Sequence, residues 1–167
     1  MARKKQPQNL WSKIIYLFIM LAGFICANCY LSDLITSNIN RGFNFPPNDF
    51  VTLSYVKNTG AAFSILENSK IFLISFSALA ILAMIFYLIK HIQKASTFAI
   101  FWASLLIAGV FCNMYERIAY GYVRDFFKLN FIDFPVFNIS DIFINISVAA
   151  IVIIIITNEI NNRRTNG

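Results

Sequence analysis

Four long apolar runs divide the chain. Each holds 17 to 19 residues without a formal charge, and together they cover Ile14–Leu31, Ile71–Ile89, Thr97–Tyr115 and Ile142–Asn158. At about 1.5 Å of rise per residue, roughly 20 residues cross a hydrocarbon core about 30 Å thick. The pattern predicts an all-α membrane protein, a bundle of four transmembrane helices in a single domain over residues 1–167. The spans are expected at about residues 14–33, 71–89, 97–117 and 139–158.

The segments between the runs differ in length. Residues 90–94 are a short connection, so the second and third spans are expected to form an antiparallel helical hairpin. Two longer outer loops, about 34–70 and 118–138, lie on the opposite side. In the first of them, residues 50–56 alternate in a β-rich manner and residues 61–66 are expected to return as a strand. The prediction is a small β-hairpin or sheet that rests on the bundle or on lipid, because it is too small for its own core.

The composition supports this class and sets its orientation. Hydrophobic residues make up 58% of the chain and charged residues 13%, which is unlike a soluble domain. The two tails and the short connection carry eight Lys or Arg residues against one acidic residue, Glu159. Basic residues in short loops mark the cytoplasmic side, so both termini are expected there. The net charge of +6 then indicates contact with anionic membrane lipids, and no nucleic-acid partner is expected.

Neither the first run nor the cysteines predict a separate function. The first run is long for the core of a cleaved signal peptide and no small-residue cleavage site follows it, so we expect it to be retained. Cys26, Cys29 and Cys112 lie inside apolar runs, where cysteine serves as a small apolar residue. No additional soft ligands are spaced for zinc, so neither a metal nor another cofactor is expected.

Few residues remain for chemistry. The one histidine, His91, lies in the short cytoplasmic connection, so no Ser-His or Cys-His pair can form at the outer side. The sequence contains no glycine-rich phosphate loop and no His-Glu zinc motif. If the chain is an enzyme, carboxylates or lysines must carry the reaction.

The outer end of the third span has a polar face. Gly109, Asn113 and Arg117 are spaced four residues apart and therefore share one side of a helix. Arg117 alone could extend to the lipid headgroups. Asn113 lies one turn deeper, where an amide is expected to face protein or water rather than lipid.

The start of the fourth span has a similar face, formed by Asn138, Asp141 and Asn145. Asn138 could simply cap the helix. Asp141 lies near the outer boundary of the hydrocarbon core, where a carboxylate is costly and indicates a functional site. A second carboxylate, Asp125, comes shortly before it in the outer loop. Two neighbouring carboxyl groups can hold one proton between them, activate a water and polarise a carbonyl.

Asp125 has a simpler interpretation when it is taken alone. It could be a loop aspartate paired with Arg124 or Lys128. The two polar helix faces beside it favour a site instead. Asp133 has no such polar company and is expected to be solvated.

Several features together resemble lipoprotein signal peptidase (signal peptidase II). Besides the four spans, the resemblance rests on Asn58-x-Gly60-Ala-Ala-Phe63, Asn113-x-x-x-Arg117, Gly121-x-Val123-x-Asp125-Phe126 and Phe134-Pro-Val-Phe-Asn138-x-x-Asp141. They occur in order over nearly the whole chain, and their combination is more specific than any one of them.

The resemblance implies a multi-pass aspartyl endopeptidase of the bacterial inner membrane, with its active site at the periplasmic face. Its substrates would be prolipoproteins, cut just before a cysteine that carries diacylglycerol, and a monomer is expected. The catalytic residues would be Asp125 and Asp141. Residues around the substrate would be Asn58, Asn113, Arg117 and Asn138.

Three positions depart from the motifs of that family. Asp33-Leu-Ile-Thr36-Ser37 has serine where the first-span motif usually has lysine. Cys112 replaces a glycine and adds bulk where helices pack closely. Glu116 replaces an aspartate and lengthens the side chain. These changes leave both aspartates of the expected dyad in place.

Two alternatives use the same residues. The first is a divergent, non-catalytic membrane paralogue that binds lipid or lipopeptide in the same cleft. The second is a proton-coupled carrier with Asp141 as a relay, which the lack of an internal repeat disfavours.

Overall fold

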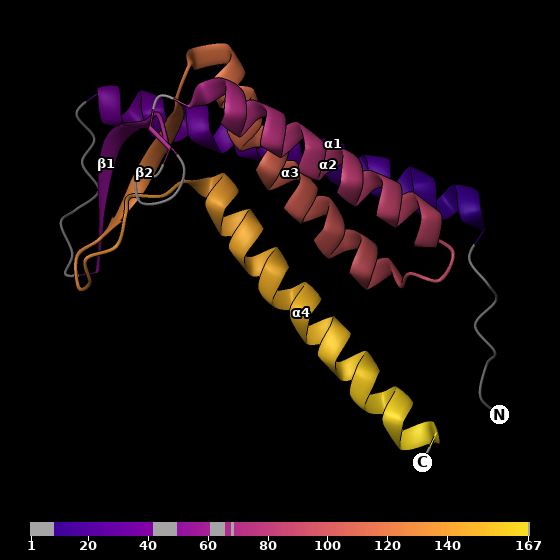
Figure 1. Cartoon of the computed structure of the whole chain (residues 1–167). Helices are drawn as coiled ribbons and strands as arrows, with labels where there is room; N and C mark the ends of the chain where they lie inside the picture. The colour runs from indigo at the N-terminus through magenta and orange to yellow at the C-terminus, as the bar shows by residue number, and fades with distance from the viewer. Residues whose placement is uncertain (1–8, 42–49, 61–65, 68, 167) are drawn as a thin grey trace.

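The computed structural model describes residues 9–41, 50–60, 66–67 and 69–166 of the chain. In chain order the elements are α1 (Leu10–Asn40), β1 (Val51–Asn58), α2 (Lys70–His91), α3 (Thr97–Tyr120), β2 (Val123–Leu129) and α4 (Ile139–Asn166). Four long helices and a small antiparallel sheet confirm the predicted fold class (Figure 1).

All four helices are long and apolar enough to span a membrane. The shortest, α2, has 22 residues and is about 33 Å long. Large apolar side chains cover the outside of the helices; Phe18, Leu79, Phe86 and Ile155 are each more than 60% exposed. In water so large an apolar surface would be unfavourable, whereas in a bilayer it contacts acyl chains. The chain is therefore a multi-pass membrane protein.

The helices do not contribute equally to the bundle. α1, α2 and α3 pack together along their length, whereas α4 diverges from them toward the C-terminus (Figure 1). The bundle core is apolar and contains Leu17, Ile81, Leu88, Ile92, Ile100 and Ile107. The first turns of α4 are therefore the part that packs against the bundle, and they pack against α3.

A glycine permits the contact between α3 and α4. A Cβ atom at Gly109 would lie 2.8 Å from the Ser140 carbonyl oxygen and 2.9 Å from Cγ1 of Ile144, closer than real contacts allow. Cys112, at which the sequence suggested close packing, is buried beside α1 instead, where it lines a small cavity together with Cys29. Close approach of the two helices thus depends on Gly109 rather than on residue 112.

Lys13 fixes the connection between α2 and α3. Its Nζ donates to the carbonyl oxygens of Ile92, Gln93 and Ala95 at 3.2, 2.8 and 2.7 Å. The three donors of the ammonium are matched to three carbonyl acceptors at a helix end, where a positive charge is favourable. Lys13 therefore holds the fold together in addition to contributing to the charge pattern.

The sheet joins the two outer segments. β1 and β2 pair antiparallel, with Val56 opposite Asp125 and Asn58 opposite Val123. The second strand therefore comes from the segment between α3 and α4, and it begins 65 residues after the first strand ends. The returning strand expected at residues 61–66 falls mainly on residues 61–65, which lie outside the described part of the chain.

Gly121 turns the chain from α3 into β2. It ends the helix with φ of 86°, a left-handed conformation that favours glycine. β2 begins two residues later, at Val123. Because of this tight turn, the end of α3, the strand β2 and the start of α4 meet at one end of the bundle (Figure 1).

Candidate active site

The first turn of α4 is built by Asn138 and Asp141. The Asn138 Oδ1 accepts from the backbone N–H of Asp141 at 3.0 Å, and the Asp141 Oδ2 accepts from the backbone N–H of Asn138 at 3.0 Å. This is a reciprocal N-terminal cap. The helix dipole and the donated hydrogen bond both stabilise negative charge on Asp141. Asn138 therefore caps the helix, as one interpretation of the sequence held, and it also contacts the other polar residues.

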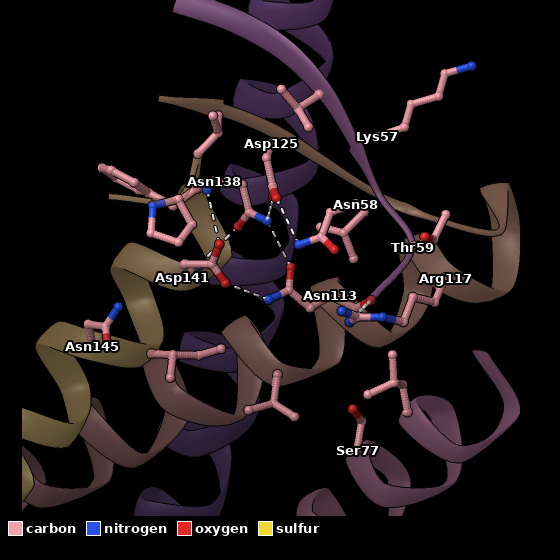
Figure 2. A pocket seen from close by; sticks show the side chains of 18 of the residues that line it. Lys57, Asn58, Thr59, Ser77, Asn113, Arg117, Asp125, Asn138, Asp141 and Asn145 are labelled. Atoms are coloured by element: carbon pink, nitrogen blue, oxygen red, sulfur yellow. Dashed lines mark hydrogen bonds between the residues drawn. The ribbon is translucent and has the colours of Figure 1, made fainter. Parts of the chain in front are cut away.

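Asn138 connects the two carboxylates. Its Nδ2 donates to Asp125 Oδ1 at 2.8 Å and to Asn113 Oδ1 at 3.1 Å. Asn113 in turn donates through Nδ2 to Asp141 Oδ1 at 2.9 Å. From β1, Asn58 donates through Nδ2 to the second oxygen of Asp125 at 3.0 Å. The two aspartates and three asparagines form one hydrogen-bonded network from four elements (Figure 2).

This network lines a cavity of about 660 Å³. Asp125, Asp141, Asn58, Asn113, Arg117 and Asn138 all line it, so the structure brings all six predicted site residues together. The remaining walls are mainly apolar and include Leu73 and Phe76 of α2 and Ile144 of α4. The cavity can therefore accept a molecule that has both a polar and an apolar part.

Asp125 is the more deeply buried of the two acids, with 2% of its surface exposed. Its pKa is raised from an ordinary value near 3.8 to about 6, and burial is the largest cause. The negative charges of Asp141 and Glu116 also raise this pKa, whereas hydrogen bonds from Asn138 and Asn58 lower it. The Asp125 carboxyl group is thus able to hold a proton close to neutral pH.

Arg117 lies beside the dyad. Its Nη2 donates to the Gly60 carbonyl oxygen at 2.7 Å and its Nη1 to the Asn113 carbonyl oxygen at 3.1 Å. Its Nε is buried and has no hydrogen-bond partner among the described residues. Arg117 therefore ties α3 to the end of β1.

Asn145 of α4 and Asp133 of the second outer segment differ in their relation to the cavity. Asn145, one turn below Asp141, is exposed and lines the cavity. Asp133 is exposed and does not line it. The geometry thus separates Asp133 from the two aspartates of the network.

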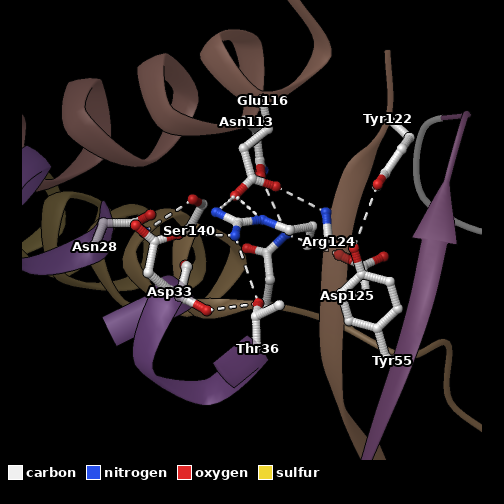
Figure 3. Close-up of polar contacts among 12 residues, drawn as sticks. Asn28, Asp33, Thr36, Tyr55, Asn113, Glu116, Tyr122, Arg124, Asp125 and Ser140 are labelled. Carbon is white, nitrogen blue, oxygen red and sulfur yellow. Dashed lines mark hydrogen bonds and ion pairs between the residues drawn. The ribbon is translucent and has the colours of Figure 1, made fainter. Parts of the chain in front are cut away.

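A second polar cluster, which the sequence did not predict, lies on the other side of β2 (Figure 3). Arg124 forms ion pairs with Glu116 at 2.7 Å and with Asp33 at 2.9 Å. The sequence suggested Arg124 as a simple partner of Asp125, whereas its guanidinium faces these two other acids. The sequence shows Glu116 and Arg124 eight positions apart, but it does not show that the turn at Gly121 brings them together.

A buried contact also ties α1 to α4. Asn28 Nδ2 donates to Ser140 Oγ at 2.9 Å, and both side chains are almost fully buried. An amide and a hydroxyl at membrane depth need such partners. This contact adds α1 to the elements that hold the residue next to Asp141.

The fold and this site together define a class of membrane protein with a polar cavity suited to hydrolysis. The chain is a membrane protein with two carboxylates, three asparagines and an arginine gathered in one cavity at the end of its bundle. Such groups can bind a peptide and activate a water molecule that attacks its carbonyl group.

Comparison with known proteins then identifies the family. The family model described as Signal peptidase (SPase) II matches residues 20–157. A lipoprotein signal peptidase of Streptococcus thermophilus is 40% identical over 139 residues, which cover 82% of this chain and 90% of that protein. One from Lactococcus lactis subsp. cremoris is 31% identical over 150 residues, covering 88% and 97%. The chain belongs to the signal peptidase II family and is a protease, which confirms the resemblance seen in the sequence.

Solved structures agree with this assignment. A bacterial membrane enzyme determined by the in meso method at 2.3 Å resolution matches with a TM-score of 0.77 and 27% identity. The match covers 87% of this chain and 90% of that one. A second bacterial membrane enzyme, determined at 1.9 Å resolution, matches with a TM-score of 0.72.

Proposed function

We propose that the chain is an aspartic endopeptidase that removes signal peptides from diacylglyceryl-modified prolipoproteins, with Asp125 and Asp141 as its catalytic residues. The observation that carries the proposal is the network in which Asn138 contacts both carboxylates within a lined cavity. Family membership supports the substrate class, because the relatives are named lipoprotein signal peptidases.

The proposed reaction uses one proton held by the pair. Asp141, stabilised as an anion at the start of α4, takes a proton from water while the water oxygen attacks the scissile carbonyl carbon. Asp125, whose raised pKa favours the protonated form, donates its proton to the carbonyl oxygen. The resulting gem-diol collapses when Asp141 returns a proton to the amide nitrogen and the C–N bond breaks. At the same time Asp125 takes a proton from one hydroxyl group of the gem-diol, whose carbon becomes the new carboxyl group, so both aspartates return to their starting states.

The surrounding polar residues have distinct proposed roles. Asn113 and Asn138 hold the carboxylates in place, because each donates to at least one of them. Asn58 holds Asp125 from the opposite side and offers its amide to an extended peptide. Arg117 holds the end of β1 through its bond to the Gly60 carbonyl oxygen. These four residues would bind the polypeptide, while the apolar walls from α2 and α4 would accept its lipid and signal-peptide portions.

The position of the cavity fits a substrate that lies in the membrane. The carboxylates lie where α3 ends and α4 begins, opposite the α2–α3 connection that Lys13 fixes. With the basic residues on the cytoplasmic side, both termini would face the cytoplasm and the cavity would open at the outer face of a bacterial cytoplasmic membrane. A single chain supplies all six site residues, so we propose that it functions as a monomer.

The experiment is an assay of signal-peptide release. Purified protein in detergent is incubated with a prolipoprotein, either diacylglyceryl-modified or unmodified, and the products are separated on a gel. We expect cleavage of the modified substrate before its lipid-bearing cysteine and at least a tenfold slower reaction of the unmodified one. Binding of the modified substrate without cleavage would contradict the proposed activity.

A further inference from the structure

We propose that Arg124 is a positioning residue: held by Glu116 and Asp33, it fixes the backbone of β2 so that Asp125 stays in place within the dyad. This inference rests on the proposed function. It concerns a cluster that lies outside the cavity and contacts none of the reacting groups directly.

Glu116 accepts three hydrogen bonds from Arg124. Its Oε1 accepts from Arg124 Nε at 2.9 Å and from Nη2 at 2.7 Å, and its Oε2 accepts from the Arg124 backbone N–H at 2.7 Å. The third bond holds the main chain itself, one residue before Asp125. A side chain that bonds both the guanidinium and the backbone of one residue restricts that residue more than an ion pair alone.

The rest of the guanidinium is held by α1 and by the end of α3. Arg124 Nη1 donates to Asp33 Oδ1 at 2.9 Å and to Thr36 Oγ1 at 3.5 Å. The Tyr120 ring lies 4.9 Å from the guanidinium carbon, measured to the ring centre. A planar, five-donor group suits this arrangement because it can engage several partners at once. The cluster therefore ties α1, α3 and β2 together at one point (Figure 3).

Arg124 and Asp125 face opposite sides of the strand. Arg124 lines the small cavity between α1 and α3, and Asp125 lines the large cavity of the proposed active site. Successive side chains of a strand alternate in this way. Arg124 therefore fixes the strand on the side of the small cavity, and Asn58 and Asn138 hold the Asp125 carboxylate on the side of the large cavity.

Glu116 and Asp33 are not equivalent partners of Arg124. The side chain of Glu116 is 10% exposed, whereas that of Asp33 is 66% exposed. An exposed ion pair is screened by solvent and contributes little, whereas removing one partner of a buried pair leaves an uncompensated charge. Glu116 should thus matter more than Asp33 for the position of β2. The Glu116 carboxylate bonds both the side chain and the main chain of Arg124.

The test compares Arg124→Met and Glu116→Gln with Lys128→Met, an exposed basic residue of the same strand. Cleavage of the diacylglyceryl-modified prolipoprotein is measured well below the unfolding temperature of each variant. We expect kcat to fall about 10- to 100-fold for the first two, with KM within about threefold, because a displacement near 1 Å suffices for such a loss. Lys128→Met should match the wild type, and Asp33→Asn should lose less than about threefold.

Conservative variants and a double variant separate positioning from folding. Arg124→Lys keeps the charge but cannot engage both acids, so its kcat should lie between those of Arg124→Met and the wild type. The double variant Arg124→Met/Glu116→Gln should be no slower than Arg124→Met alone, because both changes remove the same contact. Wild-type kcat in Arg124→Met together with a lowered unfolding temperature would show a purely structural role and overturn the inference.

A readout that does not depend on cleavage keeps the two proposals apart. Amide hydrogen exchange is followed in β2, where the Phe126 N–H bonds the Phe137 carbonyl oxygen at 2.9 Å. Arg124→Met should speed exchange of this amide at least tenfold relative to the wild type and to Lys128→Met. Unchanged exchange would overturn the positioning role, whether or not the protein cleaves prolipoprotein. Absence of cleavage by the wild type would instead contradict the proposed function alone.

Discussion

The start of α4 and the strand β2 each supply one acid, but they hold it in different ways. Asp141 is held by the first turn of its own helix, through the reciprocal cap with Asn138 three residues earlier, and by one tertiary contact from Asn113 of α3. Asp125 is held from other elements, by Asn58 of β1 and by Asn138 just before α4. Local contacts thus predominate at Asp141 and tertiary contacts at Asp125. We therefore expect that removing a hydrogen-bond partner from another element displaces the Asp125 carboxylate more than the Asp141 carboxylate.

Removing either acid should have the largest effect. Asp125→Asn and Asp141→Asn each remove a carboxyl group that transfers a proton in the proposed reaction. We expect kcat for prolipoprotein cleavage to fall about 10²- to 10⁴-fold in each variant. Asp133→Asn, an exposed acid outside the cavity, should retain wild-type activity. Comparable activity in all three variants would remove the dyad from the mechanism.

The same contrast explains what the sequence could predict. Each apolar run became a membrane helix, because burial in a bilayer demands length and apolarity that are visible along the chain. The cap at Asn138 and Asp141 was also accessible, since it lies within one turn. The pairing of β1 with β2 was not, because two membrane helices separate the strands and no local pattern specifies the partner. The ion pair between Glu116 and Arg124 depends on that strand pairing and on the turn at Gly121.

The pH dependence of stability should follow Asp125. Its pKa is raised from near 3.8 to about 6 in the folded protein, so the fold favours the protonated form. The corresponding stabilisation is complete below about pH 4 and is lost as the pH rises through 6, an effect on the order of 3 kcal/mol. Unfolding temperatures measured in detergent between pH 4 and 7 should fall less steeply for Asp125→Asn than for the wild type. Asp133→Asn is the control and should parallel the wild type.

Asn138 and Asn58 allow the two regions to be compared directly. Asn138→Ala removes the side chain that caps α4 and its contacts with Asp125 and Asn113, but keeps the backbone N–H that donates to Asp141. We expect kcat to fall about 10- to 100-fold and stability by about 1 kcal/mol. Asn58→Ala removes one contact with Asp125 and the bond that Asn58 Oδ1 accepts from the Gly60 N–H. We expect kcat to fall less than about tenfold, with the helix α4 unaffected. Measuring kcat and the unfolding temperature of both variants tests this order. A larger kinetic loss in Asn58→Ala would mean that the tertiary contacts dominate at both acids.

The contact between α4 and α3 should affect the stability of the fold without removing any group of the site. Gly109→Ala forces a methyl group against the Ser140 carbonyl and Ile144, and we expect a loss of about 1–3 kcal/mol in unfolding free energy. Gly23→Ala is the matched control, because nothing lies within 4 Å of a Cβ there. The control should be neutral or slightly stabilising. Equal effects of the two changes would show that α4 is not seated by this contact.

An infrared titration of the Asp125 carboxyl group examines the coupling between the two acids. The carbonyl stretch of the protonated acid is followed with pH in the wild type and assigned by its loss in Asp125→Asn. The geometry predicts a midpoint near pH 6, and a lower midpoint in Asp141→Asn, since the Asp141 charge contributes to the shift. A midpoint that stays the same when Asp141 is replaced would contradict an interacting pair.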